Sequence, residues 1–223
     1  MERIIHRISL IITMCMIVNC ATATTHVTEK DGIKYTIYYL GGDHVNYAEI
    51  TGATRSGDIN IPATVTHCDW YDGGTQRDMT FRVRRISSGA FRNCTDITSI
   101  YIGENVDFIG YQAFDGCSGL TSIFISKSVS NMNNYDGTLF RGCGALESII
   151  VESGNAKYDS RNNCNALIET STNTLVLGCK NTIIPEDVTT INNYAFYNCS
   201  DLNAITIPRS VTKIGDYAFQ GCI

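Results

Sequence analysis

The chain has 223 residues and a formal net charge of −5; 17% of its residues are charged and 43% are hydrophobic. This balance is typical of a folded protein with a sizeable core and excludes a disordered chain. An acidic chain is a poor non-specific ligand for nucleic acid, so we expect no nucleic-acid partner. The 10 cysteines make the redox compartment the first question to settle.

Residues 1–23 have the order of a secretory signal peptide. A short segment with two arginines precedes an apolar run over residues 8–18, and Ala21-Thr22-Ala23 offers a cleavage site between small residues. The apolar run is much shorter than the roughly 20 residues that span a bilayer. We therefore predict an exported protein, secreted or held at the cell surface. Cys20 leaves open a lipid-modified N-terminus, which would be a link to the membrane.

An internal repeat determines the predicted architecture of the remaining chain. Its clearest mark is Ala-Phe or Leu-Phe, then two residues, then Cys, and the five copies end at Cys94, Cys117, Cys143, Cys199 and Cys222. The intervals between these cysteines are 23, 26, 56 and 23 residues. An apolar triplet with the spacing of L-x-x-I-x-I follows each of the first four, and most coils then add a second apolar pair, V-x-x-I or V-x-x-M. Such periodicity indicates a repeat architecture.

One such unit cannot be stable alone. Over residues 95–117, about six large apolar side chains contribute roughly 1.5–3 kcal/mol each when buried. Ordering the backbone costs roughly 1–2 kcal/mol for every residue of the unit, which is more. Neighbouring units must therefore stack and share strand hydrogen bonds. We predict a β-rich solenoid of short strands joined by turns or short helical segments.

The segment from Leu202 to Cys222 has the form L-x-x-I-x-I-P-x-x-V-x-x-I-G-x-x-A-F-x-x-C almost intact. This pattern resembles the BspA-like leucine-rich repeat family of secreted and cell-surface proteins, and the resemblance covers residues 59–223. It implies a curved leucine-rich repeat solenoid whose strands line one face. It also implies adhesion, or binding to other macromolecules, and no catalysis.

Three parts of the chain depart from the repeat. Alternating apolar residues in 24–58 predict an N-terminal β-hairpin that caps the open end of the solenoid. Irregular insertions over about 67–82 and 152–180 each have the pattern of a hairpin. The sequence stops at Ile223, one residue after a repeat cysteine, which predicts either a truncated repeat region or an exposed last coil.

The sequence offers no constellation for catalysis, and we expect no enzyme activity, cofactor or metal. His67 and Cys68 are adjacent, but neighbouring strand residues point to opposite faces and cannot form a working pair. The sequence has no C-x-x-C or H-x-x-x-H spacing and no glycine-rich phosphate loop.

The repeat cysteines are predicted to be buried thiols. Stacked coils place equivalent Cα atoms about 4.8 Å apart with parallel side chains, whereas a disulfide needs Cβ atoms about 3.8 Å apart. Cys164 and Cys179 differ, because they bracket the hairpin of the second insertion. We hypothesise a disulfide between these two.

Outward-facing strand positions are the predicted partner-binding residues. Between the last two apolar positions of each strand lie Tyr101, Phe124 and Ile150, with Ser99 and Ser122 two positions earlier. Exposed apolar rows often mark interaction sites, although cross-strand packing would also explain them. A second candidate is Trp70 with Tyr71, near the tip of the first insertion. The expected partner is a protein or glycan at the cell surface; the alternative is a structural or spacer module of a larger surface protein.

Overall fold

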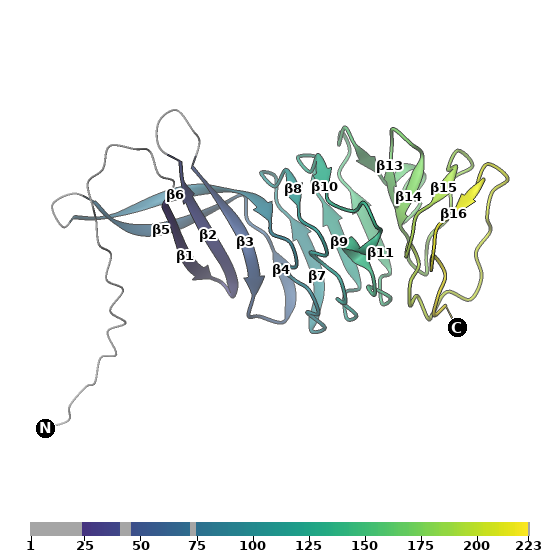
Figure 1. Cartoon of the computed structure of the whole chain (residues 1–223), viewed down its shortest axis with the longest axis horizontal. Coiled ribbons are helices and arrows are strands. Elements are labelled where there is room, and N and C mark those ends of the chain that lie inside the picture. The colour runs from purple at the N-terminus through teal and green to yellow at the C-terminus, as the bar shows by residue number, and fades with distance from the viewer. Residues whose placement is uncertain (1–23, 41–45, 72–74, 223) are drawn as a thin grey trace, which may run out of the picture.

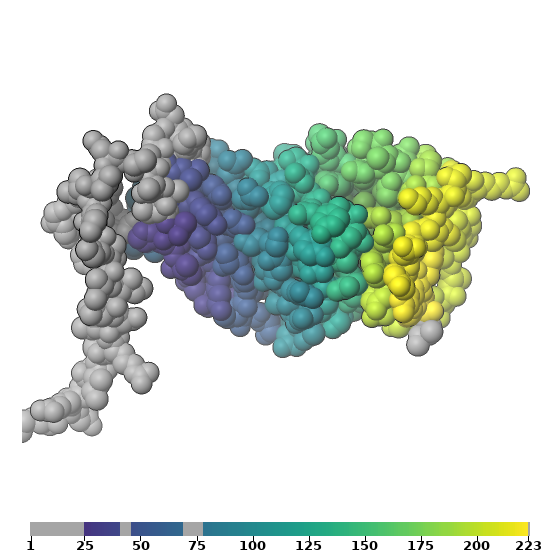
Figure 2. Space-filling view, in the orientation of Figure 1, coloured from purple at the N-terminus to yellow at the C-terminus, as the bar shows by residue number. Residues whose placement is uncertain are grey.

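The computed structural model describes residues 24–40, 46–71 and 75–222, without the side chains of residues 24 and 69–77. The predicted signal peptide and Cys20 lie outside this part, so export and lipid modification stay predictions. Successive parts of the chain follow one another along the long axis of the molecule (Figure 2). Within the described ranges no helix is long and apolar enough to cross a membrane.

Three strands make an antiparallel arrangement at the N-terminal end (Figure 1): β1 (Thr24–Lys30), β2 (Ile33–Tyr39) and β3 (Tyr47–Ala53). Alternation in β2 buries Ile33, Tyr35 and Ile37 and turns the intervening residues outward. The last strand, β3, then pairs in parallel with β6 of the repeat region. These strands thus lie beside the first coil, and their action as a cap stays a prediction.

The first insertion forms a long antiparallel hairpin of β5 (Thr64–Tyr71) and β6 (Thr75–Ile86). The hairpin reaches past β1–β3 in Figure 1. The second half of β6 is at the same time a repeat strand, because Ile86 pairs with Ile50 on one side and with Ile109 on the other. The hairpin is therefore continuous with the repeat ladder.

The two apolar patterns of the repeat form two separate sets of parallel strands. The first three triplets and β4 together form the first sheet, made of β4 (Gly57–Asn60), β7 (Ile97–Ile102), β9 (Ser122–Ile125) and β11 (Ser148–Val151). The fourth triplet, from Leu202 to Ile207, forms no strand. The V-x-x-I pairs form much shorter strands: β8 (Phe108–Ile109), β10 (Asn131–Met132), β15 (Thr190–Ile191) and β16 (Lys213–Ile214). Equivalent residues pair in register from coil to coil, as Ile100, Ile123 and Ile149 do.

The second insertion adds β12 (Tyr158–Asp159), β13 (Leu167–Glu169) and β14 (Thr174–Leu177). Strands β13 and β14 form an antiparallel hairpin, and β14 then pairs in parallel with β15. Two short 3-10 helices complete the elements, η1 (Thr138–Phe140) and η2 (Arg161–Asn163).

The compact turn before each repeat cysteine requires a left-handed backbone. Positive φ values of 58° to 81° occur at Asn93, Gly116, Gly142, Asn198 and Gly221. Asparagine and glycine tolerate this conformation better than other residues. The physical basis of the F-x-[N/G]-C signature is therefore the turn itself.

Behind this turn, Phe and Cys form two buried ladders. The rings of Phe91, Phe114 and Phe140 stack in sequence with centroid separations of 5.5 and 5.3 Å. The thiol of Cys117 donates to the carbonyl oxygen of Phe91 at 3.0 Å, and that of Cys143 to the carbonyl of Phe114 at 3.2 Å. The five repeat cysteines are unpaired, as predicted. Cys117, Cys143 and Cys199 are buried as predicted, whereas Cys94 and Cys222 are only half-buried.

The disulfide expected between Cys164 and Cys179 is wrong for this structure, because both residues are buried, unpaired thiols. The Cys179 thiol is directed to the carbonyl of Asn165 at 3.4 Å, and the Cys164 thiol is 3.9 Å from the carbonyl of Ala166. Bracketing the hairpin in sequence does not bring the two side chains together, since they belong to different core clusters.

Alkylation tests this arrangement. At mildly alkaline pH we expect slow modification of Cys199 in the folded protein, because burial raises its pKa to about 11 and keeps the reactive thiolate scarce. In denaturant without a reductant, all cysteines of residues 24–223 should react with iodoacetamide. Intact mass counts the adducts. If two cysteines reacted only after reduction, the protein would contain a disulfide and the arrangement described here would be wrong.

The core consists of two clusters that meet at the second insertion. The first contains residues from Ile33 to Cys179 and the second residues from Cys164 to Ala218. The coil that ends at Cys143 nevertheless packs on the coil that ends at Cys199: a Cβ at Gly144 would lie 1.9 Å from the carbonyl oxygen of Asn198. A glycine at this place lets the two backbones approach each other.

Candidate functional site

The first candidate surface is the outer row, defined as Tyr101, Phe124 and Ile150 on β7, β9 and β11. These residues are directly paired across the sheet. Tyr101 is 43% exposed and Ile150 is 49% exposed, while Phe124 is half-buried. The rings of Tyr101 and Phe124 stack at 4.7 Å with an interplanar angle of 9°. The row is thus both packed across strands and open to solvent.

Hydroxyl groups flank the outer row. Ser99 and Ser122 pair across the sheet two positions before Tyr101 and Phe124, as predicted from the spacing. At the edge of this flank, the Asp58 carboxylate accepts hydrogen bonds from the hydroxyls of Ser99 at 2.6 Å and Thr98 at 3.0 Å. These hydrogen bonds lower the pKa of Asp58. The flank is polar and carries a negative charge at one end.

The β11 edge of the first sheet is closed by side chains from the second insertion. The amide of Ile149 donates to the side-chain oxygen of Asn165 at 3.0 Å, and the amide of Val151 donates to the hydroxyl of Ser160 at 3.1 Å. Occupied amides prevent another strand from extending the sheet at β11. At this edge, a partner of the sheet would therefore contact its face.

Trp70 and Tyr71, the other predicted contact residues, end strand β5 opposite Gln76 and Thr75. Their side chains lie outside the described residues. Their role in binding stays a prediction.

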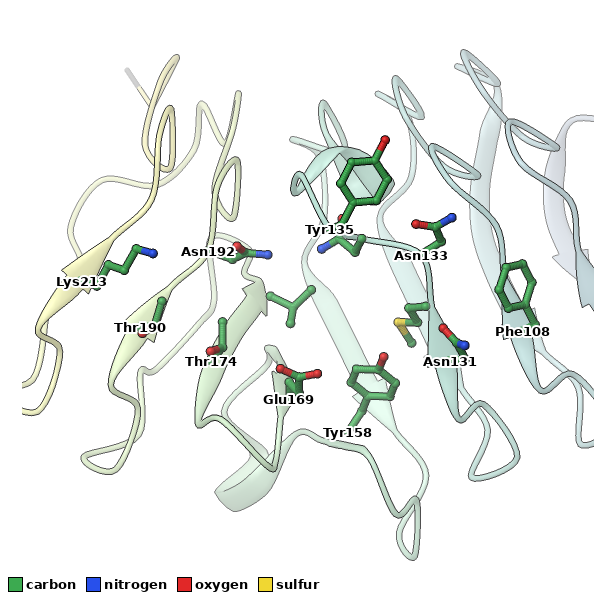
Figure 3. Close-up of a pocket in the computed structure, with 13 residues that line it drawn as sticks. Phe108, Asn131, Asn133, Tyr135, Tyr158, Glu169, Thr174, Thr190, Asn192 and Lys213 are labelled. Carbon is green, nitrogen blue, oxygen red and sulfur yellow. The ribbon is translucent and has the colours of Figure 1, made fainter.

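A second candidate surface, which the sequence analysis missed, is a hollow of about 700 Å³ between β10 and β14. Strand β10 ends one sheet and β14 belongs to another, so the ladder of short strands is interrupted here. In Figure 3, Phe108, Asn131 and Asn133 lie on one side of the hollow. The other side carries Thr174, Thr190, Asn192 and Lys213, as Figure 3 also shows.

Two departures from the repeat create this hollow. The interval between Cys117 and Cys143 is 26 residues where the regular interval is 23, and the extra residues lengthen the segment 133–139. The second insertion then supplies Tyr158, Glu169 and β14. The irregular interval was the available signal, but only the three-dimensional structure shows that the two irregular segments border one space.

Aromatic side chains stand at the rim and at the base of the hollow. Tyr135 is 80% exposed and stacks on Tyr111 with ring centroids 5.4 Å apart. Phe108 is covered on one face by the guanidinium of Arg85, whose Cζ lies 4.3 Å from the ring centroid. Tyr158 is buried, and this burial raises the pKa of its hydroxyl. The same hydroxyl is hydrogen-bonded to the backbone of Met132.

The charges around the hollow nearly balance. Its lining contains one carboxylate, Glu169, and one ammonium group, Lys213. The Glu169 carboxylate accepts a hydrogen bond of 2.6 Å from Thr172. Across the described ranges, no three His, Cys, Asp or Glu side chains are grouped to hold a metal ion. The hollow offers hydrogen bonds and aromatic faces to a ligand.

The repeat region of this chain is similar to a known protein family. A family model described as the BspA type leucine-rich repeat region matches residues 75–175 and 168–223, in 6 copies. No curated protein matches the chain.

Several solved structures are similar to parts of the chain. A leucine-rich repeat protein of T. pallidum is 21% identical, with a TM-score of 0.44, and the match covers 87% of this chain and 67% of that one. The pneumococcal vaccine antigen PcpA is 15% identical with a TM-score of 0.45, covering 91% and 69%. A leucine-rich cell surface protein of Faecalibacterium prausnitzii A2-165 is 20% identical with a TM-score of 0.32, covering 86% and 73%. Because the family model matches more than half of the residues, the chain belongs to the BspA type leucine-rich repeat family.

Proposed function

We propose that this protein is exported, forms a curved solenoid, and binds a protein partner at the cell surface through the outer row. The observation that carries the proposal is the exposure of Tyr101 and Ile150 in one paired row with Phe124. Contiguous exposed apolar side chains with a polar surround are typical of interaction surfaces. Export is supported by the N-terminal segment of the sequence, and membership of the family is consistent with an extracellular location.

The position of this surface on the face of a sheet favours a protein over a small molecule. The row lies on the face of a sheet, and its flank of hydroxyls ends at Asp58. An apolar centre with a polar rim is the common anatomy of a protein interface. Aromatic residues near the centre often contribute most of the binding energy.

Binding by the mature chain to an array of extracellular-matrix and cell-surface proteins tests the proposal. For a partner found in this way, Tyr101→Ser/Phe124→Ser should weaken binding about tenfold or more, because loss of two central aromatics removes more than 1.4 kcal/mol. The matched control is Ile183→Ser/Tyr217→Ser, which changes two exposed apolar residues outside the row. Equal affinities of the wild type and the row variant would refute the proposal. Trp70→Ala tests the hairpin tip in the same assay.

The alternative function is a structural or spacer module without a partner of its own. The stacking of Tyr101 on Phe124 supports it, because cross-strand aromatic pairs stabilise sheets. On this alternative, the row variant would unfold at a lower urea concentration, and the folded wild type would bind nothing on a broad array.

A further inference from the structure

We propose that the hollow between β10 and β14 is a second binding site, and that its ligand is a neutral oligosaccharide. Its volume of about 700 Å³ lies within the range of small-molecule sites, roughly 300–1,000 Å³. It lies on a different sheet from the outer row. Sugar binding at the hollow can therefore be tested independently of the protein interface proposed above.

Polar side chains without partners converge on this hollow. Within the described part of the chain, the side-chain amides of Asn131, Asn133 and Asn192 make no hydrogen bond, although all three line the space. Asn131 lies in β10 and Asn133 directly follows that strand, whereas Asn192 directly follows β15 on the other side of the hollow. Each amide presents donors and an acceptor that a ligand can use.

Several other asparagines of the repeat region are hydrogen-bonded within the fold. Asn134 accepts a hydrogen bond from the amide of Leu139 at 2.9 Å, and Asn155 donates to the carbonyl of Val129 at 2.9 Å. Asn165 accepts from the amide of Ile149. The amides around the hollow share their lack of a partner with other surface asparagines, such as Asn60 and Asn163, so the convergence of three of them on one space is what favours a ligand.

Aromatic faces complete the recognition chemistry. A pyranose ring has hydroxyl groups at its edge and C–H groups on its face, and those C–H groups pack favourably on the negative face of an aromatic ring. Tyr135 offers such a face at the rim. The combination of amides with an exposed tyrosine matches both features of a sugar.

The segment that carries Tyr135 is held in place before any ligand arrives. Tyr111 donates a hydrogen bond of 2.9 Å from its hydroxyl to Asp136, and its ring stacks on that of Tyr135. Asp136 in turn accepts hydrogen bonds from the amide of Thr138 at 3.0 Å and from its hydroxyl at 2.7 Å. A prearranged rim lowers the entropic cost of binding.

Charge and strand length exclude the competing ligand classes. One carboxylate and one ammonium group leave the lining without the excess of cations that a sulfated or sialylated glycan needs. Strand β10 contributes only Asn131 and Met132 to its ladder, which is too little main chain for a peptide to add as a strand. A neutral sugar is the ligand that these features fit together.

The test uses the mature chain on an array of neutral, sialylated and sulfated oligosaccharides and of extracellular-matrix peptides, followed by calorimetry with the strongest neutral oligosaccharide. Tyr135→Ala and Asn192→Ala should each weaken binding about tenfold. The matched control is Tyr217→Ala, because Tyr217 is 58% exposed and stacks on Tyr194 as Tyr135 does on Tyr111. The outer-row variant should bind the sugar like the wild type.

Three results would overturn the proposal. The first is binding to charged glycans or peptides alone, and the second is no binding to any neutral oligosaccharide by a folded sample. The third is an equal loss of sugar affinity in Tyr135→Ala and Tyr217→Ala. Circular dichroism of each variant separates a lost contact from a lost fold. Loss of sugar binding in the outer-row variant would contradict the separation of the two sites.

Discussion

Replacing Phe114 by alanine should lower the free energy of unfolding by about 3–5 kcal/mol, as expected for a large aromatic removed from a core. The Phe114 ring is fully buried and lies between two other rings, those of Phe91 and Phe140. Its loss therefore opens a cavity between three consecutive coils. Urea unfolding followed by circular dichroism measures the change.

Phe219→Ala is the control, since this ring is half-buried and stacks on Phe196 with a centroid separation of 5.0 Å. Removing a partly exposed ring should cost about 1–2 kcal/mol. A loss of stability in Phe114→Ala no larger than that in Phe219→Ala would show that burial of a ring between two neighbouring rings adds nothing to stability.

Gly144→Ala is expected to destabilise the protein by about 3 kcal/mol or more, at the upper end of the cost of overpacking. The added methyl group would lie 1.9 Å from the carbonyl oxygen of Asn198. That carbonyl belongs to a turn whose amide already donates to Gln220 at 2.8 Å. The backbone there has little freedom to move, so the coils around residues 144 and 198 must separate.

Gly154→Ala isolates the conformational part of a glycine substitution. Gly154 has a φ of 88°, and nothing lies within 4 Å of a Cβ built there. An alanine should cost about 1–2 kcal/mol through its left-handed backbone alone. If Gly144→Ala lowers the free energy of unfolding in urea no more than Gly154→Ala does, the close approach of the two coils is incorrect.

The repeated features of the fold could be predicted because the same residue types occupy equivalent positions in each coil and make the same contacts. Ile100 and Ile123 occupy equivalent places in two copies, and their in-register pairing follows from stacking. The outward direction of Tyr101 follows from strand alternation. The unpaired state of Cys117 follows from the spacing of parallel strands.

The features at the second insertion could not be predicted, because they depend on how one irregular segment folds over its neighbours. The residues that cap β11, Asn165 and Ser160, follow that strand in sequence, but no repeat specifies their positions. The same holds for the hollow, where Asn133 and Glu169 line one space at an interrupted ladder. Periodicity carries no information about a segment that occurs once.

The division of the core at the second insertion has a consequence for how the chain acquires its structure during synthesis. Most of the first cluster is complete in sequence before residues 180–222 have been made. Equivalent residues of regular coils are 23 residues apart, and the first cluster needs no residue after Cys179. During synthesis the N-terminal parts of a chain generally fold first. We expect the N-terminal coils to be structured while the last two are still emerging, so that the later coils add to an existing template.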